Sequence, residues 1–185
     1  MKKLAFFSSL LVVTMFVLGA CSKKDDIPIT PSPVTVTFSM PFNVIGAANT
    51  TISNSASANL ADILTPSGNK NNVNGVTGSV IGTGSTIVFA GISGTGATLS
   101  NITFSTTDNI IKNVVINDSF TKQPIVISND TTLTMGEPNY LSFLGQIGTY
   151  LASKKSITLY ASYKINNQSI PNGKITLNIA TTFGW

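Results

Sequence analysis

The feature that most constrains the fold is a strict alternation of apolar and polar residues toward the C-terminal end. In Ser156–Ile165 every second residue is apolar, and Lys174–Phe183 repeats the pattern. Successive side chains point to opposite faces of a strand, so each segment predicts a strand with one buried face. Between them, Pro171-Asn172-Gly173 contains Asn-Gly, a strong hairpin signal. We therefore expect these two strands to form a C-terminal β-hairpin.

Further short strands are expected along the chain, separated by turn-forming residues. Val34–Met40 alternates in the same way, and Pro41 either ends that strand or places it at a sheet edge. The polar stretch 49–58 is interpreted as a turn, and 57–64 as a short helix capped by Ser57. The remaining strand candidates are 85–92, 99–105, 110–116, 124–127 and 131–135. The spacing of the turns is typical of an all-β sandwich.

One segment has the periodicity of a helix instead. Its apolar-face residues recur every three or four positions: Tyr140, Leu141, Leu144, Ile147, Gly148 and Leu151. This predicts an amphipathic helix near 138–155, with Pro138 in its first turn and Lys154 and Lys155 at its negative end. The predicted fold class is therefore mainly all-β: an antiparallel β-sandwich of short strands with one amphipathic helix.

The N-terminal segment has the layout of a secretory signal. A basic start is followed by the apolar run 4–17, and small residues precede Cys21, the only cysteine. The run is at the short limit for a membrane-spanning helix, which is the alternative interpretation. We predict a cleaved signal peptide at 1–20, a charged and proline-rich tether at 21–33 and a β-sandwich domain at 34–185.

The residues Leu18-Gly19-Ala20-Cys21 resemble the lipobox of bacterial lipoproteins. This resemblance implies lipid attachment to the Cys21 sulfur, cleavage before Cys21 and acylation of the new amino terminus. Lys24-Asp25-Asp26 resembles the lipoprotein export signal of Bacteroidetes, which implies an outer-membrane protein exposed on the cell surface. A solvated spacer and a periplasm-facing protein are the alternatives. The folded domain resembles no family that we recognise.

The composition excludes several kinds of catalytic site. Histidine is absent, and lipidation would use the only thiol, so Ser-His-Asp, Cys-His and histidine-based zinc sites cannot form. The acids of the domain fall mostly in expected turns or at a helix start: Asp62, Asp108, Asp118, Asp130 and Glu137. We therefore predict no enzymatic activity and no cofactor. Arginine is also absent and the lysines are scattered, which argues against nucleic-acid binding.

Two modification or ligand motifs fall at the acidic turns. Asp108, Asp118 and Asp130 each neighbour an asparagine, and oxygen ligands suit Ca²⁺. However, no D-x-D-x-D-G loop is present, so side-chain-capped turns are favoured and no metal site is predicted. Asp130-Thr131-Thr132 resembles the O-glycosylation acceptor of Bacteroidetes, although a turn before a strand is the favoured interpretation.

The expected function is a non-catalytic binding or structural role in the cell envelope. Tyr160, on the polar face of its strand, and Trp185 are the candidate ligand-binding residues, because aromatic rings stack on sugars. One alternative is delivery of a glycan or lipid to a membrane transporter; a lipid would require a deep apolar pocket beneath the helix 140–151. Another is an enzyme that uses carboxylates alone, which requires two converging acids. The expected partners are the membrane, through the lipid, and an envelope protein or glycan.

Overall fold

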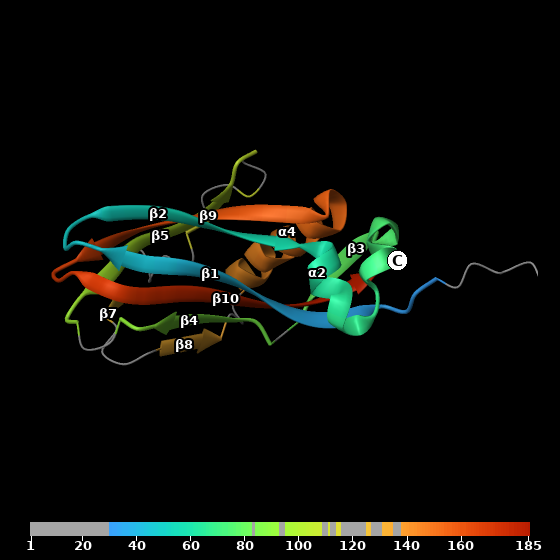
Figure 1. The fold of residues 1–185 in the computed structure, drawn as a ribbon, viewed down its shortest axis with the longest axis horizontal. Helices are drawn as coiled ribbons and strands as arrows, with labels where there is room; N and C mark the ends of the chain where they lie inside the picture. Colours follow the sequence, from blue (N-terminus) through green and yellow to red (C-terminus); the bar gives the residue numbers. More distant parts are fainter. Residues whose placement is uncertain are drawn as a thin grey trace, which may run out of the picture. The chain divides into compact units, whose positions relative to one another are not determined.

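Two antiparallel sheets pack face to face in the computed structural model, forming a β-sandwich (Figure 1). The structure describes residues 30–82, 84–92, 95–108, 111, 114–115, 125–126, 131–134 and 138–185. Residues 31–185 form one compact unit. The predicted fold class, a mainly antiparallel β-sandwich with an amphipathic helix, is confirmed.

The first sheet, sheet A, is built around the long C-terminal strand β10. Its strands are β1 (Val34–Gly46), β3 (Gly78–Ile81), β4 (Thr86–Ala90), β8 (Thr131–Thr134) and β10 (Ile170–Gly184). The order is β1-β10-β4-β8, and β3 pairs with the last residues of β10 on the same side as β4. Thus β10 lies between β1, the first strand of the domain, and the strands β3 and β4.

The second sheet, sheet B, has β9 at its centre. Its strands are β2 (Thr51–Asn59), β5 (Thr98–Thr106), β6 (Val114–Val115), β7 (Ile125–Val126) and β9 (Ser156–Asn166). The order is β2-β9-β5-β6, and β7 also pairs with β5. On the side of the sandwich where β1 and β2 lie, each sheet therefore ends in an edge strand.

Strand β1 continues through Pro41 and lies at the edge of sheet A. The backbone N–H and C=O of Ala180, opposite Thr37, are both used on the far side of β10, by Ser85 and Gly82. Backbone groups of alternate residues point to the same side, so Thr37 and Pro41 both face the free edge. Pro41 consequently costs no ladder hydrogen bond, and its predicted edge position is confirmed.

The predicted C-terminal hairpin is wrong. Strands β9 and β10 form where the alternation placed them, but β9 belongs to sheet B and β10 to sheet A. Asn172 and Gly173 lie inside β10, and the chain turns earlier, at Asn167, where φ is +69°. Inward-facing residues of the two strands therefore meet across the sandwich core instead of side by side in one sheet.

The stretch 49–58, interpreted as a turn, is mostly strand β2. It contains few large apolar residues because, as an edge strand, it presents one face to solvent and pairs along its length with β9. The short helix α2 (Leu60–Leu64) follows and is capped by Asn59, whose side chain accepts from the Ala61 N–H at 2.8 Å. The helix prediction is thus confirmed, whereas Ser57 is a strand residue.

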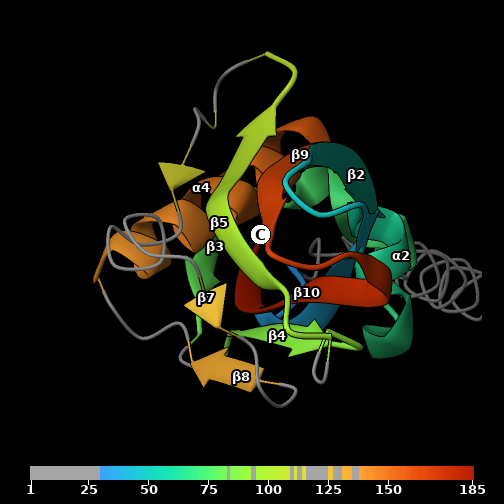
Figure 2. The same cartoon turned by 90° about the vertical axis from the view of Figure 1, so that its left-hand side faces the viewer.

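Helix α4 (Pro138–Lys154) closes the core on the side away from β2 (Figure 2). Its residues Leu144, Ile147 and Leu151 are fully buried, as the predicted apolar stripe requires, and Phe143, which the prediction did not include, is fully buried as well. Phe104 of β5 contacts Phe42 of β1 and Phe143 of α4, with ring centroids 5.2 and 5.8 Å apart. Two short 3-10 helices, η1 (Thr65–Ser67) and η2 (Lys70–Gly75), follow α2.

Candidate functional site

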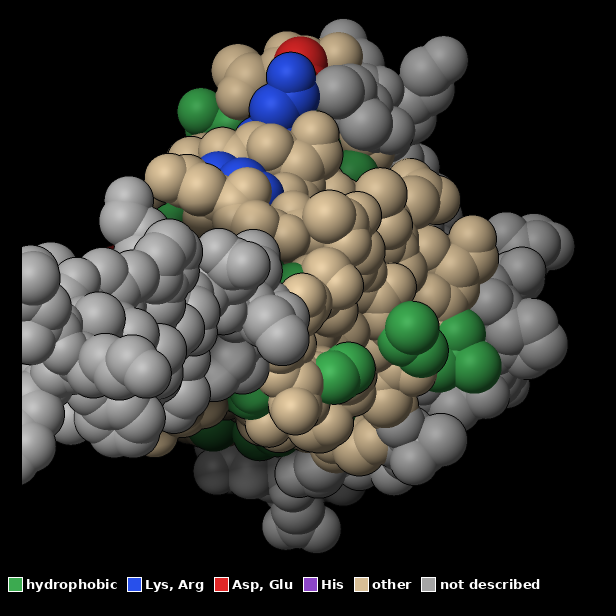
Figure 3. All heavy atoms as spheres, turned by 90° about the vertical axis from the view of Figure 1, so that its right-hand side faces the viewer, with side chains coloured by type: hydrophobic (Ala, Val, Ile, Leu, Met, Phe, Trp, Pro, Cys, Tyr) green, Lys and Arg blue, Asp and Glu red, His purple; other side chains and the backbone are tan. Residues whose placement is uncertain are grey.

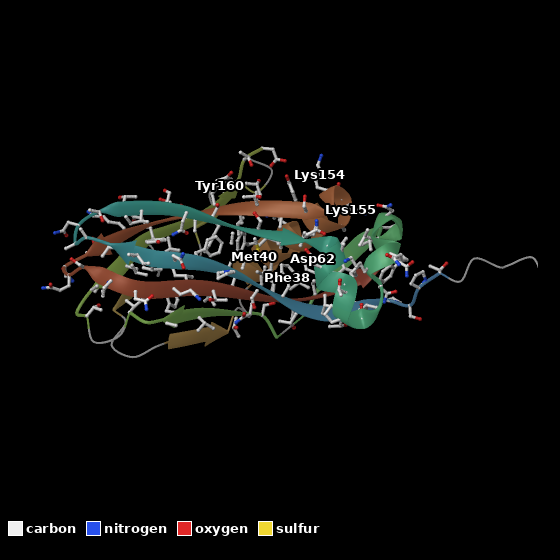
Figure 4. The ribbon with its side chains drawn as sticks, in the orientation of Figure 1. Phe38, Met40, Asp62, Lys154, Lys155 and Tyr160 are labelled. Carbon is white, nitrogen blue, oxygen red and sulfur yellow. The ribbon has the colours of Figure 1, made fainter. Side chains whose placement is uncertain are left out.

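Tyr160 projects from the outer face of sheet B, and 40% of it is exposed (Figure 4). It lies on the central strand β9, directly opposite Ser55 of β2 and Ser105 of β5. The alternation along β9 explains this position, because Leu159 and Ala161 on either side are buried. Tyr160 is thus a large aromatic side chain with small residues opposite it on both neighbouring strands.

Hydroxyl groups surround this ring on three strands. Their residues are Ser53, Ser55 and Ser57 on β2, Thr158 and Ser162 on β9, and Thr103 and Ser105 on β5. The Ser57 and Thr158 hydroxyls are hydrogen-bonded at 2.9 Å across the strands. We call Tyr160 and these seven residues the hydroxyl face. None of these eight residues is charged, so they offer neutral donors and acceptors around one aromatic ring; Lys164 lies on the same face of β9, two residues beyond Ser162.

A groove lies between the edge strands β1 and β2, beside α2. The groove has a volume of about 310 Å³. Residues of β1, β2, α2 and η1 line it: Thr37, Phe38, Ser39, Ser57, Ala58, Asn59, Asp62, Ile63 and Pro66. Asp62 is the one acid among these lining residues. Figure 3 shows this end of the molecule, where uncharged polar surface predominates and lysine side chains gather on one side.

Trp185, the second aromatic candidate, is not brought near Tyr160. Its indole Nε1 donates to the carbonyl oxygen of Asn72 at 2.7 Å, and its ring lies against Gly75 of η2. The side chain is half-buried at the end of sheet A, whereas Tyr160 lies on the outer face of sheet B. The structure therefore gives Trp185 a packing contact, and Tyr160 alone of the two remains in an open position.

The lipid-carrier alternative requires an apolar pocket beneath α4. The core-facing residues of α4, including Phe143 and Ile147, are fully buried. A cavity of about 400 Å³ lies instead on the outward-facing side of α4, along Ser142, Gln146, Thr149 and Ser153. None of the described helices is long and apolar enough to cross a membrane.

Of the two described acids of the domain, Asp62 lies in α2 and Asp108 in the turn that follows β5. Asp108 accepts hydrogen bonds from the Thr106 hydroxyl at 2.9 Å and the Tyr150 hydroxyl at 2.8 Å, joining the end of β5 to α4. This contact with Asp108 raises the pKa of Tyr150. Within the described ranges, no three acid, cysteine or histidine side chains gather as a metal site. Asp118, Asp130 and Glu137 lie outside the described residues.

The predicted anchor and sorting residues also lie outside the described residues: Cys21, Lys24, Asp25 and Asp26. The same holds for Asp130 of the glycosylation motif, whose Thr131 and Thr132 belong to β8. The groove beside α2 does not follow from the sequence pattern, because it depends on β2, whose polar sequence is typical of a turn.

Comparisons with known proteins give no family. No family model matches the chain, and no curated protein matches it. Among solved structures, a decameric BFDV capsid protein aligns with 83% of this chain and 98% of its own, at 12% identity and a TM-score of 0.43. The infectious bursal disease virus Gx strain structure aligns over 84% and 37%, at 12% identity and a TM-score of 0.30. At these values neither likeness bears on what this chain binds.

Proposed function

We propose that this chain is a lipid-anchored protein of the bacterial outer membrane, exposed at the cell surface, whose β-sandwich binds a neutral glycan without catalysis. The resemblance of Leu18–Cys21 to a lipobox and of Lys24–Asp26 to an export signal supports the location. The hydroxyl face supports the binding role.

The exposure of Tyr160 at the centre of that face carries the proposal. A pyranose ring has a face of C–H groups that packs on an aromatic ring, and its hydroxyls project outward from the ring edge. Tyr160 supplies the aromatic surface, and Ser55, Ser105 and their neighbours supply hydrogen-bond partners at the spacing of adjacent strands, about 4.8 Å. Because none of its eight residues is charged, the hydroxyl face suits a neutral sugar better than an anionic or cationic one.

Binding is tested with the soluble unit 31–185 on an array of neutral, acidic and amino-sugar glycans. Tyr160→Ser should lower affinity at least tenfold, because it replaces the stacking ring with a hydroxyl like those of its neighbours. Tyr160→Phe keeps the ring and should retain most of the affinity. Binding that survives Tyr160→Ser, or that is confined to charged glycans, would show that the hydroxyl face is not the site.

The anchor is tested separately. Each buried CH₂ of an attached lipid contributes about 0.8 kcal/mol of membrane binding, so several acyl chains hold a protein on a bilayer. Cys21→Ser should move the protein from the membrane to the soluble fraction. Replacing Lys24, Asp25 and Asp26 with alanines should leave the lipid in place and reduce cleavage by protease added to whole cells. Continued membrane association of Cys21→Ser would exclude the lipid anchor.

A further inference from the structure

Strand β2 has an open edge along its whole length. Even-numbered residues make the hydrogen bonds at the two ends of the β2–β9 pairing. At one end the Thr50 carbonyl accepts from the Ile165 N–H, and at the other the Leu60 N–H donates to the Lys155 carbonyl. The pairing with β9 has no register shift between these ends. Odd-numbered residues, such as Ser53, Ser55 and Ser57, therefore direct their backbone N–H and C=O groups to the other side, where no described strand pairs with them.

The two neighbouring edge strands are protected differently. β1 has Pro41 at an edge-facing position and a register shift between Val44 and Gly46, both of which hinder pairing by another strand. β2 has the sequence TISNSASAN, with no proline, glycine or charged residue. An unprotected, regular edge of this length is a template for strand pairing.

We propose that β2 pairs antiparallel with β2 of a second copy of this chain. A two-fold axis at Ser55 gives the longest overlap, with Thr51 opposite Asn59 and Ser53 opposite Ser57 of the other copy. In this register, each outward side chain of β2 that faces one from the second copy is small, polar and uncharged. The edge of β2 is therefore complementary to itself. The chain already uses such hydroxyl pairs between its own strands, at Ser57–Thr158 (2.9 Å) and Thr35–Thr182 (2.7 Å).

Pairing at Ser55 would join the two hydroxyl faces. Ser55 is directly opposite Tyr160, so one straight row would run Tyr160, Ser55, Ser55 of the second copy, Tyr160 of the second copy. Three strand spacings separate the outer members, which places the two tyrosine rings about 14 Å apart on one continuous sheet. Resting on the proposed function, this arrangement predicts a two-tyrosine platform that binds oligosaccharides of about three sugars or longer more tightly than monosaccharides.

The pairing is tested by sedimentation of the soluble unit 31–185 over a range of concentrations. The unmodified unit should form dimers, and Ser55→Pro should shift it to monomers, because proline removes an edge-facing N–H and leaves the ladder to β9 intact. Thr37→Pro is the matched control, since Thr37 faces the free edge of β1, and it should remain dimeric. Monomers at all concentrations for the unmodified unit would overturn the proposal, as would a Ser55→Pro dimer.

Cross-linking gives a second readout that does not depend on a folded proline variant. The unit 31–185 contains no cysteine. Across the axis, the thiol introduced by Ser55→Cys would face its own copy at a Cα separation of about 5.5 Å, within the range for a disulfide. The thiol introduced by Ser57→Cys would face Ser53 and should not cross-link. A disulfide-linked dimer of the Ser55→Cys variant, together with an unmodified unit that binds no glycan, would uphold the pairing and reject the proposed function, whereas equal cross-linking of both variants would overturn the pairing.

Discussion

The ammonium group of Lys155 donates a hydrogen bond to the carbonyl oxygen of Val76 at 3.0 Å, and a second to that of Ala152 at 2.5 Å. The backbone carbonyl of Lys155 also accepts from the Leu60 N–H at 2.8 Å. One residue therefore joins the end of α4, the residue after η2 and the start of α2. These elements form the end of the sandwich beside the groove.

Lys155→Met should lower the free energy of unfolding by about 1–3 kcal/mol, because it removes two hydrogen bonds from a charged donor while keeping the aliphatic stem. Lys154→Met is the control. Lys154 is exposed, so its replacement should change stability by no more than about 0.5 kcal/mol. Urea unfolding of the two variants measures the difference, and equal effects would mean that the Lys155 contacts contribute nothing.

Gly148→Ala should destabilise the protein although alanine favours helices. A Cβ at Gly148 would lie 2.5 Å from Ser79 Oγ and 3.2 Å from Ser79 Cβ, so the Ser79 hydroxyl would have to rotate and α4 to shift slightly from β3, at a cost of about 1–3 kcal/mol. At Gly145 the nearest atom is 4.0 Å away, and Gly145→Ala should stabilise by up to about 1 kcal/mol. Thermal unfolding should therefore shift in opposite directions for the two variants. Adding Ser79→Ala should recover part of the loss at Gly148.

Local periodicity predicts the elements well, but it does not predict which strands pair. The alternation in 156–165 correctly gives the buried faces of β9, including Leu159 and Ala161, and hence the outward position of Tyr160. It carries no information on the partner strand, so the Asn172-Gly173 signal predicts a hairpin that does not form. In the structure Gly173 pairs with Val44 inside a sheet, and the tertiary contact overrides the local turn preference.

Strand β2 shows the opposite case: its sequence has a low preference for strands, yet the strand pairs regularly with β9. Its residues Ser53, Ser55 and Ser57 have low strand preference, yet all pair with β9. The hydroxyl face is predictable only in part for this reason: the alternation along β9 identifies Tyr160, whereas three of its neighbours have the sequence of a turn. Trp185 is a candidate by its chemistry alone, and its burial against η2 depends on contacts that no local pattern encodes.

Gly91→Ala should be strongly destabilising. Gly91 has φ +69°, and a Cβ there would overlap the carbonyl oxygen of Asn172, a backbone atom that cannot rotate away. We expect a loss of at least about 3 kcal/mol. Gly68→Ala separates the two causes, because φ is +77° there and nothing lies within 4 Å of the added Cβ. That variant should lose only about 1–2 kcal/mol by chemical denaturation. Similar losses at both sites would show that the overlap at Asn172 is relieved.

Tyr163 should make stability fall in alkaline solution. It is fully buried, its hydroxyl donates to the Asn43 carbonyl, and the Asn54 amide donates to it at 2.8 Å. Burial raises the pKa of this phenol, and the hydrogen bond from Asn54 opposes the rise. In the unfolded chain a tyrosine titrates near pH 10, so above about pH 10 the unfolded state loses a proton that the folded state keeps. The free energy of unfolding therefore decreases as pH rises through that window, and below it the group has no such effect.

Tyr163→Phe isolates this contribution. At neutral pH it should cost about 1 kcal/mol, because the Asn43 carbonyl loses a donor. Above about pH 10 its stability should decline less steeply than that of the unmodified protein, since the buried phenol no longer titrates. Tyr160→Phe is the control, as that ring is exposed, and it should keep the steeper decline. Urea unfolding at about pH 8 and about pH 11 distinguishes the two, and identical slopes for all three proteins would show that Tyr163 does not set the alkaline limit.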